Sequence, residues 1–362
     1  MPKISYKMEL SKRINAFAQL GKFLGEFTEA KEWKDYSNGV SKSDFDEFNE
    51  LIVKVKIFNG WFSEEMVRKA IGGIASWLDE KTLKDFTAKY DLSIVKSKRV
   101  ALIMAGNIPL VGFHDIMCSL LCGHSVLLKF SSEDDKLIPL VFKYLVQIEP
   151  EFYNFIRVAD ARMNNYDAVI ATGSDNTNRY FESYFGKYPH IFRGNRTSVA
   201  VITGEESKEE LVKMGNDVFD FYGLGCRNVS KVLVPNGYNL NKIFEAFFGF
   251  QDIINHNKYA NNYDYNKAIL LMESTKDLLE NGFLLVKKDK ELHSPLAVLF
   301  YDEYEDQKEV DDFITKHQEK IQCVVGKKYI PFGQAQKPAI NDFADGVDTM
   351  AFLGRLANGV IS

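Results

Sequence analysis

The residue with the most evident chemical potential in this sequence is Cys226, which follows a Gly-x-Gly turn formed by Gly223 and Gly225. Glycines let a backbone adopt positive φ and approach a ligand closely. A cysteine at such a turn, where a helical turn can begin, is a candidate thiolate nucleophile. A buried structural thiol is the alternative, since free cysteine is among the most buried residue types. Taken alone, this stretch favours the structural thiol.

Two further turns have features that suit a dinucleotide. Gly173 and Ser174 precede an expected helix, whose N-terminus would offer N–H groups and the positive end of a dipole to a pyrophosphate. Lys129 ends an apolar run, and the small residues Ser131 and Ser132 after it leave room for ribose hydroxyls or a 2′-phosphate. A serine cap and a solvated lysine are the simpler interpretations. Because the sequence has no G-x-G-x-x-G motif, it does not support an ordinary Rossmann dehydrogenase.

Two polar residues border other apolar runs. Asn107 stands in a Gly-Asn-Ile-Pro turn, where its side chain could donate a hydrogen bond to a developing oxyanion. Asparagine also suits the geometry of many turns without any chemical role. Glu291 precedes an expected strand, and on the residues alone it can be plain surface charge.

His114, Cys118 and Cys122 fall four residues apart, with His124 just beyond, which resembles the spacing of metal ligands. A helix between two buried strands should bury such a face, and its other members are apolar. We therefore expect packed thiols and no metal. Cys323 lies in an apolar run and is expected in the core.

An alternation of strands and helices is expected to position these turns. Residues up to about 90 are predicted to be helical, because apolar residues recur there at three- and four-residue steps. After them, apolar runs alternate with amphipathic segments, which is typical of βαβ units and mostly parallel sheets. Such sheets bind ligands at the carboxyl ends of their strands. The turns around Asn107, Lys129 and Gly173 are therefore the ones expected to carry function.

A second sheet is expected from about residue 231 onwards. We predict strands at 231–235, 268–272, 283–287, 296–301 and 322–325, helices at 240–250 and 305–317, and an irregular tract at 255–266. We place the domain boundary at the Gly and acidic turn of residues 203–207, after a strand at 198–202. The expected organisation is a helical N-terminal region (1–90), a dinucleotide-binding α/β domain (91–205), a catalytic α/β domain with Cys226 (206–330) and a C-terminal segment (331–362) returning to the cofactor domain.

The bulk composition excludes several classes of protein. The chain has 362 residues, a formal net charge of −5 and a pI near 5.8, so it lacks the basic excess that nucleic acid requires. Four scattered cysteines do not form a disulfide framework. No apolar run is long enough to cross a bilayer, and residues 1–20 lack the apolar core of a signal peptide. We therefore expect a cytoplasmic protein without a membrane span.

Together these turns resemble motifs of the aldehyde dehydrogenase superfamily, and most closely its acyl-CoA reductase branch of the luminescence fatty-acid reductase type. The resemblance runs from about Val100 to the C-terminal segment, with six motifs in the same order. Three motifs lie in the first half of the chain: Gly106-Asn107-Ile108-Pro109-Leu110 resembles the superfamily's Pro-x-Asn-x-Pro-Leu, Lys129-Phe130-Ser131 resembles Lys-Pro-Ser, and Thr172-Gly173-Ser174 matches Thr-Gly-Ser. Two more follow: Gly225-Cys226 lies at the position of Gly-Gln-x-Cys, and Glu291-Leu292-His293-Ser294-Pro295 resembles Glu-x-Phe-Gly-Pro. The sixth is the C-terminal segment, residues 332–336 and 344–353, which resembles the reductase branch.

The resemblance implies an aldehyde-dehydrogenase-like α/β fold, with two parallel-sheet domains, a cleft between them and a helical N-terminal region. It implies that Cys226 is the nucleophile and that Asn107 supports the oxyanion. The cofactor-binding residues that it implies are Lys129, Ser131 and Ser132 for the adenosine ribose, Gly173 and Ser174 for the pyrophosphate, and Glu291 for the nicotinamide ribose.

The sequence departs from the superfamily at two positions. Phe192 stands where the superfamily has the glutamate that acts as general base for hydrolysis. Without that base an acyl-enzyme is poorly hydrolysed, which favours acyl-CoA reduction over aldehyde oxidation. His293 stands where the family usually has an aromatic residue that stacks on the nicotinamide.

The implied activity is reduction of a long-chain fatty acyl-CoA to its aldehyde, with NADPH favoured and NAD as the alternative cofactor. An acyl phosphate or a carrier-bound acyl group is the alternative substrate, and a catalytically silent dinucleotide-binding scaffold is the alternative class. Relatives work with acyl-activating or acyl-transferring partner proteins, so such a partner and a homo-oligomer are both compatible with the resemblance.

Overall fold

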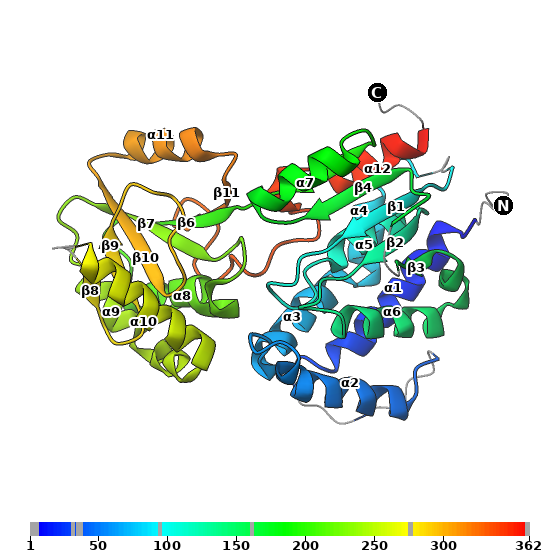
Figure 1. Ribbon diagram of the computed structural model, residues 1–362, viewed down its shortest axis with the longest axis horizontal. Helices are drawn as coiled ribbons and strands as arrows, with labels where there is room; N and C mark the ends of the chain where they lie inside the picture. Colours follow the sequence, from blue (N-terminus) through cyan, green and yellow to red (C-terminus); the bar gives the residue numbers. More distant parts are fainter. Residues whose placement is uncertain are drawn as a thin grey trace. The chain divides into compact units, whose positions relative to one another are not determined.

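Two compact units make up the chain in a computed structural model, Met1–Gly194 with Ala339–Ser362 forming the first and Asn195–Pro338 the second (Figure 1). The structure describes residues 7–29, 33, 39–92, 96–159, 163–273 and 278–358. Each unit has its own sheet and its own hydrophobic clusters. This confirms the expected α/β class with two mainly parallel sheets.

The first unit contains a five-stranded, fully parallel sheet in the order β3-β2-β1-β4-β5. Its strands are β1 (Arg99–Ile103), β2 (Ser125–Lys129), β3 (Ile156–Val158), β4 (Ala168–Thr172) and β5 (His190–Arg193). The central strand β1 pairs Val100 with Val126 of β2 on one side and Ala168 of β4 on the other. Its short apolar run is buried on both faces, as parallel sheets require.

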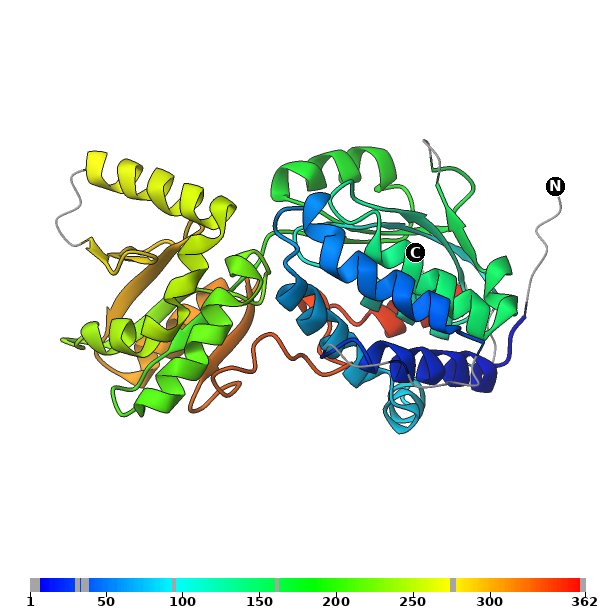
Figure 2. The ribbon, with the colours of Figure 1, turned by 90° about the horizontal axis from the view of Figure 1, so that it is seen from below.

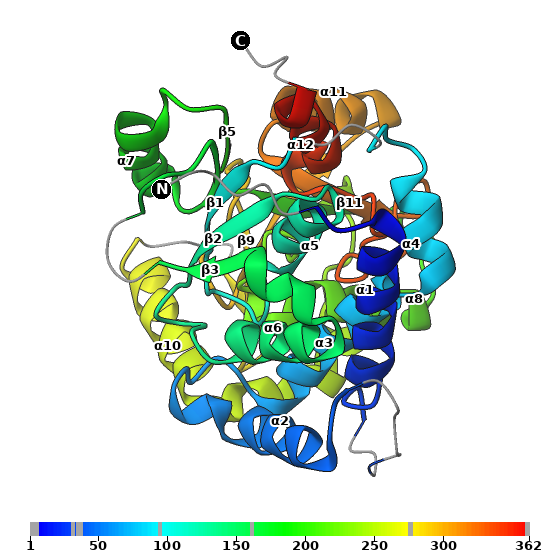
Figure 3. The ribbon, with the colours of Figure 1, turned by 90° about the vertical axis from the view of Figure 1, so that its right-hand side faces the viewer.

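Helices cover both faces of this first sheet. The helices of the first unit up to residue 194 are α1 (Leu10–Gly25), α2 (Lys42–Lys54), α3 (Glu64–Trp77), α4 (Glu80–Thr87), α5 (Phe113–Leu121), α6 (Leu137–Ile148) and α7 (Asp175–Phe185). Helices α5 and α6 pack on one face with Val100 and Leu102, whereas α7 packs on the other face with Ala101 and Val169 (Figure 3). The inward residues of β1 therefore alternate between two separate clusters, with a period of two.

The N-terminal helices confirm the predicted helical region and extend the larger of these clusters. Helix α2 begins with a capping box in which Ser41 and Asp44 satisfy each other's backbone N–H groups. Helix α3 begins at a cap from Ser63. Phe17 and Leu20 of α1 are fully buried, and α1 packs against both α3 and α6 (Figure 2). This layer thickens the core beneath the sheet and contributes none of the predicted site residues.

The second unit contains a six-stranded sheet in the order β11-β6-β7-β10-β9-β8. Its elements are β6 (Thr197–Val201), α8 (Lys208–Phe219), β7 (Val229–Pro235), α9 (Asn241–Phe247), α10 (Asn257–Met272), β8 (Leu279–Glu280), β9 (Leu285–Lys288), β10 (Val298–Tyr304), α11 (Gln307–His317) and β11 (Ile321–Gly326). All neighbours pair in parallel except β8 and β9, so the expected parallel sheet has one antiparallel edge strand. Helices α8 and α9 cover one face and α11 the other.

The structure corrects the domain boundary that the sequence suggested at residues 203–207. The strand β6, which we expected in the cofactor domain, pairs with β7 and β11 and so belongs to the second sheet. The chain passes from the first unit to the second between Gly194 and Asn195, before this strand. A buried strand has the same sequence pattern in either sheet, so the pattern alone could not assign it.

The irregular tract at 255–266 and the strand at 268–272 were also wrong, because residues 257–272 form the single helix α10. The imidazole of His256 caps this helix by accepting from the N–H of Tyr259. Its last turns contain alanine and leucine, which are good helix formers. An apolar run this short fits a helix and a strand equally well by periodicity.

The C-terminal segment from residue 339 belongs to the first unit, where α12 (Thr349–Asn358) packs beside α5. Met350 and Leu353 are fully buried there, and the Met350 sulfur lies 3.5 Å from the Cys122 thiol. Within the described residues, no helix has both the length and the apolar character needed to cross a bilayer.

Candidate active site

The first unit places six of the eight predicted site residues at one edge of its sheet. Strands β2, β1 and β4 are neighbours and parallel, so the turns after them emerge at the same edge. The residues on these turns are Asn107 after β1, Lys129, Ser131 and Ser132 at and after β2, and Gly173 and Ser174 after β4. The other two, Cys226 and Glu291, lie in the second unit.

The Asn107 turn and the loop after β2 are in direct contact. A Cβ atom on Gly106 would lie only 2.7 Å from the Ser131 hydroxyl oxygen, so the approach of the two loops requires glycine there. The N–H of Met104 donates to the carbonyl oxygen of Lys129 at 3.2 Å. Asn107 itself is exposed on this turn. The predicted oxyanion residue and the predicted cofactor loop therefore share one rigid support.

A buried carboxyl group, Asp134, holds the far end of the same turn. Its Oδ2 accepts the N–H of Leu110 at 2.7 Å, and Leu110 has a left-handed backbone with φ of 60°. Only 3% of Asp134 is exposed, and its Oδ1 makes no hydrogen bond to the described residues. Burial raises the pKa of this carboxyl to about 7. Asp134 could not be recognised from the sequence, because it stands in an acidic run that looks like a solvated surface.

The raised pKa of Asp134 predicts a specific pH dependence of stability. The native carboxyl holds its proton up to about pH 7, whereas an ordinary aspartate loses it near pH 4, so ionisation costs stability as pH rises between these values. Asp134→Asn keeps an oxygen for Leu110 and removes the charge. We expect this variant to gain on the order of 3 kcal/mol of unfolding free energy relative to the parent between pH 5 and pH 8.

Chemical denaturation of the parent and the variant at a series of pH values measures this difference. The exposed neighbour Asp135 supplies the control, because Asp135→Asn removes only a minor contribution to the raised pKa of Asp134 and should change the pH curve far less than Asp134→Asn. Parallel stability curves for the parent and Asp134→Asn would show that the buried carboxyl does not titrate in this range.

The residues at this edge fit an anionic dinucleotide. The Gly173 N–H donates to the Arg193 carbonyl, and the Ser174 hydroxyl caps α7 by accepting from the Thr177 N–H at 3.2 Å. A helix N-terminus presents N–H groups and the positive end of a dipole, which suits a pyrophosphate. Lys129 is exposed, and within the described part of the chain no carboxylate lies within 4 Å of its ammonium group. A cation at the end of β2 and a helix N-terminus after β4 thus lie at the same edge of the sheet, on either side of β1.

Cys226 lies in the second unit, in the loop between α8 and β7. The other three cysteines are buried in hydrophobic clusters, whereas Cys226 is partly exposed. Its backbone carbonyl accepts from the Ser198 hydroxyl of β6 at 3.1 Å. A partly exposed thiol on a fixed loop meets the access requirement of a nucleophile, which the buried thiols do not.

The strand that follows Cys226 also holds the loop of Glu291. Lys231 of β7 is fully buried, and its ammonium group donates to the carbonyl oxygens of Asp289 and, at 3.2 Å, of Glu291. Ser230 donates to the carbonyl of Leu292 at 3.1 Å. Burial lowers the pKa of Lys231. The structure therefore joins both predicted site residues of this unit through β7, and it leaves the Glu291 side chain exposed.

Phe192, which the sequence resemblance aligns with the hydrolytic glutamate, packs its ring against two neighbouring aromatic rings. Phe192 of β5 stacks on His190, with ring centroids 4.0 Å apart and planes at 13°. It also packs against Phe181 of α7. A phenyl ring in this place cannot accept a proton from water, so nothing at this position activates hydrolysis.

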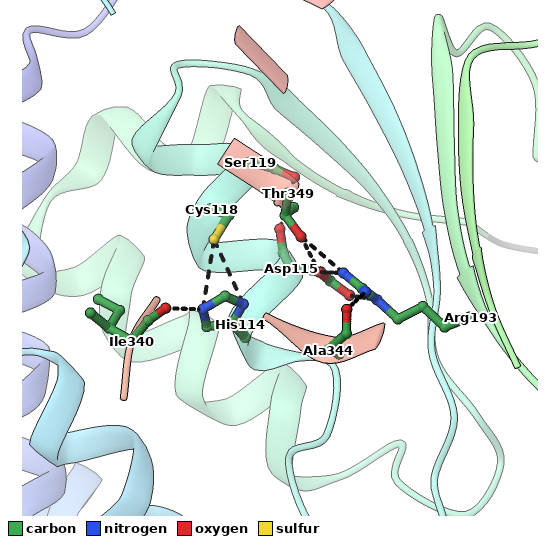
Figure 4. A network of polar contacts seen from close by, with 8 residues as sticks. All are labelled: His114, Asp115, Cys118, Ser119, Arg193, Ile340, Ala344 and Thr349. Carbon is green, nitrogen blue, oxygen red and sulfur yellow. Dashed lines mark hydrogen bonds and ion pairs between the residues drawn. The ribbon is translucent and has the colours of Figure 1, made fainter. Parts of the chain in front are cut away.

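The residues with metal-like spacing have structural roles on α5. The Nε2–H of His114 donates to the carbonyl of Ile340 at 2.8 Å, which leaves Nδ1 to face the Cys118 thiol at 3.7 Å (Figure 4). Burial raises the pKa of the Cys122 thiol to about 12, and that sulfur contacts Met350. In the described ranges, no three His, Cys, Asp or Glu side chains gather in a way that could hold a metal ion.

A buried ion pair beside His114 fastens the C-terminal segment to the sheet. Arg193 at the end of β5 makes two hydrogen bonds to Asp115 of α5, at 2.7 and 3.2 Å (Figure 4). Its other N–H groups donate to the Ala344 carbonyl at 2.5 Å and to the Thr349 hydroxyl at 2.9 Å. Arg193 is only 3% exposed, so it joins β5, α5 and the start of α12 inside the first unit.

Comparison with known sequences connects this arrangement to one family. The sequence model described as "Acyl-CoA reductase (LuxC)" matches residues 63–245, which is just over half of the chain. The match includes the Asn107 turn, the loop after β2, the α7 turn and the Cys226 loop. No curated protein matches the sequence.

Solved structures of aldehyde dehydrogenases share the fold. Aldehyde dehydrogenase 21 from Physcomitrella patens, solved with its reaction product succinate, has a TM-score of 0.63 at 11% identity and covers 97% of this chain and 85% of its own. An NADP-dependent enzyme from Escherichia coli has a TM-score of 0.63 at 11% identity, covering 88% and 73%. An aldehyde dehydrogenase from Mycobacterium tuberculosis, complexed with NAD+, has a TM-score of 0.57 at 15% identity, covering 86% and 72%.

Proposed function

Because this chain belongs to the acyl-CoA reductase (LuxC) family and has the aldehyde dehydrogenase fold, we propose that it reduces a long-chain fatty acyl-CoA to the aldehyde through an acyl-enzyme on Cys226. The protein is an oxidoreductase, and the proposal concerns its substrate, its cofactor and its site. The observation that supports it best is the exposure of Cys226, the one thiol among four that is not buried, within the matched family region.

In the proposed reaction, the Cys226 thiolate attacks the thioester carbonyl. A bond forms between its sulfur and the acyl carbon, and the bond to the CoA sulfur breaks as CoA leaves. The side chain of Asn107 and the backbone N–H of Cys226 stabilise the oxyanion, and one such donor contributes about 3 kcal/mol to lowering the barrier. When bound, the reduced dinucleotide supplies the hydride that turns the acyl-enzyme into aldehyde.

We propose NADPH as that dinucleotide. Lys129, Ser131 and Ser132 would hold its adenosine ribose and 2′-phosphate, the Gly173–Ser174 turn its pyrophosphate, and Glu291 its nicotinamide ribose. The exposed ammonium group of Lys129 supports this preference, because no acidic side chain precedes Glu133 in the loop after β2. Phe192 supports reduction rather than hydrolysis, since a phenyl ring cannot activate water.

A donor panel tests the proposal. The purified protein is given NADPH or NADH with a long-chain acyl-CoA, a short-chain acyl-CoA, an acyl phosphate or an acyl carrier protein, and dinucleotide oxidation, aldehyde and free fatty acid are measured. We expect aldehyde from the long-chain acyl-CoA with NADPH, and fatty acid as a minor product. Turnover confined to another donor would overturn the assignment of CoA. Tight dinucleotide binding without turnover on any donor would indicate a silent scaffold.

A further inference from the structure

The loop before Cys226 has an unusual backbone. After α8 ends at Phe219, three consecutive residues lie in the left-handed region, with φ of 52° at Phe221, 58° at Tyr222 and 81° at Gly223. For the two aromatic residues this conformation costs roughly 1–2 kcal/mol each. Such a conformation persists only where the surroundings fix it by several contacts. Some feature of the second unit must therefore hold this loop.

The side chain of Asn228 supplies those contacts. Its Nδ2 group donates towards the carbonyl oxygens of Asp220 at 2.7 Å and of Asp217 and Val218 at 3.2 Å each. The carbonyls of Asp217 and Val218 belong to the last turn of α8, where backbone acceptors lack partners within the helix, and Asp220 directly follows the helix. Asn228 is only 3% exposed, so water has little access to its amide group and cannot readily replace these partners. One amide thus closes the helix end and fixes the start of the left-handed segment.

The other end of the same amide holds the residue next to Cys226. The Oδ1 of Asn228 accepts the N–H of Gly225 at 2.8 Å, and the backbone N–H of Asn228 donates to the Gly225 carbonyl at 3.0 Å. Together these two bonds close a tight turn with Cys226 inside it. Carbonyl acceptors on one side and an N–H donor on the other also fix which end of the amide is nitrogen.

A second set of contacts holds Arg227, the residue that follows Cys226. The carboxylate of Asp217 accepts the N–H groups of Gly333 and Ala335, at 2.6 and 2.9 Å. The guanidinium of Arg227 in turn donates to the Ala335 carbonyl. Both chain neighbours of Cys226 are therefore held, Gly225 by Asn228 and Arg227 by the segment that Asp217 fixes.

We propose that Asn228 is the positioning residue for the Cys226 nucleophile, setting the direction of the thiol and of the Cys226 N–H by joining the end of α8 to Gly225. This inference rests on the proposed function, because it assumes that Cys226 forms the acyl-enzyme. Asn228 does not touch the reacting atoms. It acts through the turn that it closes, so its effect should be on the acyl-transfer step and not on dinucleotide binding.

The test compares Asn228→Asp with the parent. Aspartate keeps the acceptor for Gly225 but presents a carboxylate to three carbonyl oxygens, so it should release the loop. We expect kcat for acyl-CoA reduction to fall about a hundredfold, which is typical of a reacting group displaced by about 1 Å. The dissociation constant for NADPH should change less than about twofold, and the pH profile of Cys226 alkylation by iodoacetamide should shift.

Asn281→Asp is the matched control. Asn281 also uses its Oδ1 to accept backbone N–H groups, from Phe283 and Leu284, but it does so in the turn between β8 and β9. We expect this variant to keep the parent kcat and alkylation profile. Asn228→Ser, which retains a hydroxyl donor for one carbonyl, is the milder variant if Asn228→Asp does not fold.

Hydrogen exchange on the parent protein gives an answer that does not depend on any variant. The Gly225 amide should exchange at least about a hundredfold more slowly than in an unstructured peptide, because its acceptor is buried. Rapid exchange at Gly225 would overturn the proposal, as would an Asn228 variant that folds with the parent kcat and alkylation profile. Failure of the proposed role of Cys226 is distinguishable from failure of the Asn228 proposal, because Cys226→Ala would then reduce acyl-CoA as fast as the parent.

Discussion

Replacing Cys226 by alanine is expected to lower the rate of acyl-CoA-dependent NADPH oxidation by at least about a thousandfold, because the variant has no atom that can form the acyl-enzyme. The loss should lie in kcat. The dinucleotide residues of the proposal, apart from Glu291, lie in the other compact unit, so NADPH affinity should stay within about twofold of the parent. Steady-state kinetics and a fluorescence titration of NADPH measure the two effects separately.

Cys323→Ala is the control for this substitution. Cys323 lies in the same unit on β11, is 7% exposed and packs in the hydrophobic cluster under α8 and α9. Its thiol lies 3.1 Å from the Ser198 hydroxyl, so its removal should cost some stability and leave kcat unchanged. If Cys226→Ala turned over as fast as the parent while Cys323→Ala did not, the assignment of the nucleophile would be wrong.

Arg193→Met is expected to lower the free energy of unfolding by about 3–5 kcal/mol, because it leaves the Asp115 carboxylate buried without its cation. The same change removes the donors to Ala344 and Thr349 that fasten the C-terminal segment. Burial raises the pKa of Asp115, but the Arg193 guanidinium outweighs it and holds the pKa below its usual value. Without Arg193 the pKa should rise, so the loss should be larger at pH 8 than at pH 5.

Urea unfolding of four proteins tests this prediction. Arg179→Met on the exposed side of α7 is the control and should change stability by less than about 0.5 kcal/mol. Adding Asp115→Asn to Arg193→Met removes the uncompensated charge, so the double variant should recover at least about 1 kcal/mol. A loss below about 1 kcal/mol for Arg193→Met would show that the network contributes little to stability.

The sequence predicted the ends of β1, β2 and β4 in the first sheet, and the reason is physical, whereas the edge strands β3 and β5 were not predicted. Short apolar runs ending in Gly-Asn-Ile-Pro, Lys-Phe-Ser-Ser and Thr-Gly-Ser are local patterns, and parallel pairing brings their ends to one edge. The pattern that identified the candidate nucleophile was equally local, since Gly225 and Cys226 are adjacent. These residues alone could not favour a nucleophile over a structural thiol, because that preference depends on the solvent exposure of Cys226 compared with that of the three buried thiols.

Long-range contacts account for what the sequence did not predict. Asp134 looks like one member of an acidic surface run, and only its distance to Leu110 shows that it is buried in a turn. Asn228 was not singled out in the sequence, and its contacts depend on carbonyls at and just after the end of α8 that lie eight to eleven residues earlier. The strand β6 was assigned to the wrong sheet because its pairing partner β11 is more than a hundred residues away.

The covalent state of Cys226 shows directly whether this thiol forms the proposed acyl-enzyme. The protein is incubated with a long-chain acyl-CoA in the absence of reduced dinucleotide, and its intact mass and a peptide map are recorded. We expect one acyl group per chain on Cys226, stable for minutes because Phe192 cannot activate water, and lost as aldehyde when NADPH is added. An acyl group on another residue, or an unmodified Cys226 in a protein that still produces aldehyde, would contradict it.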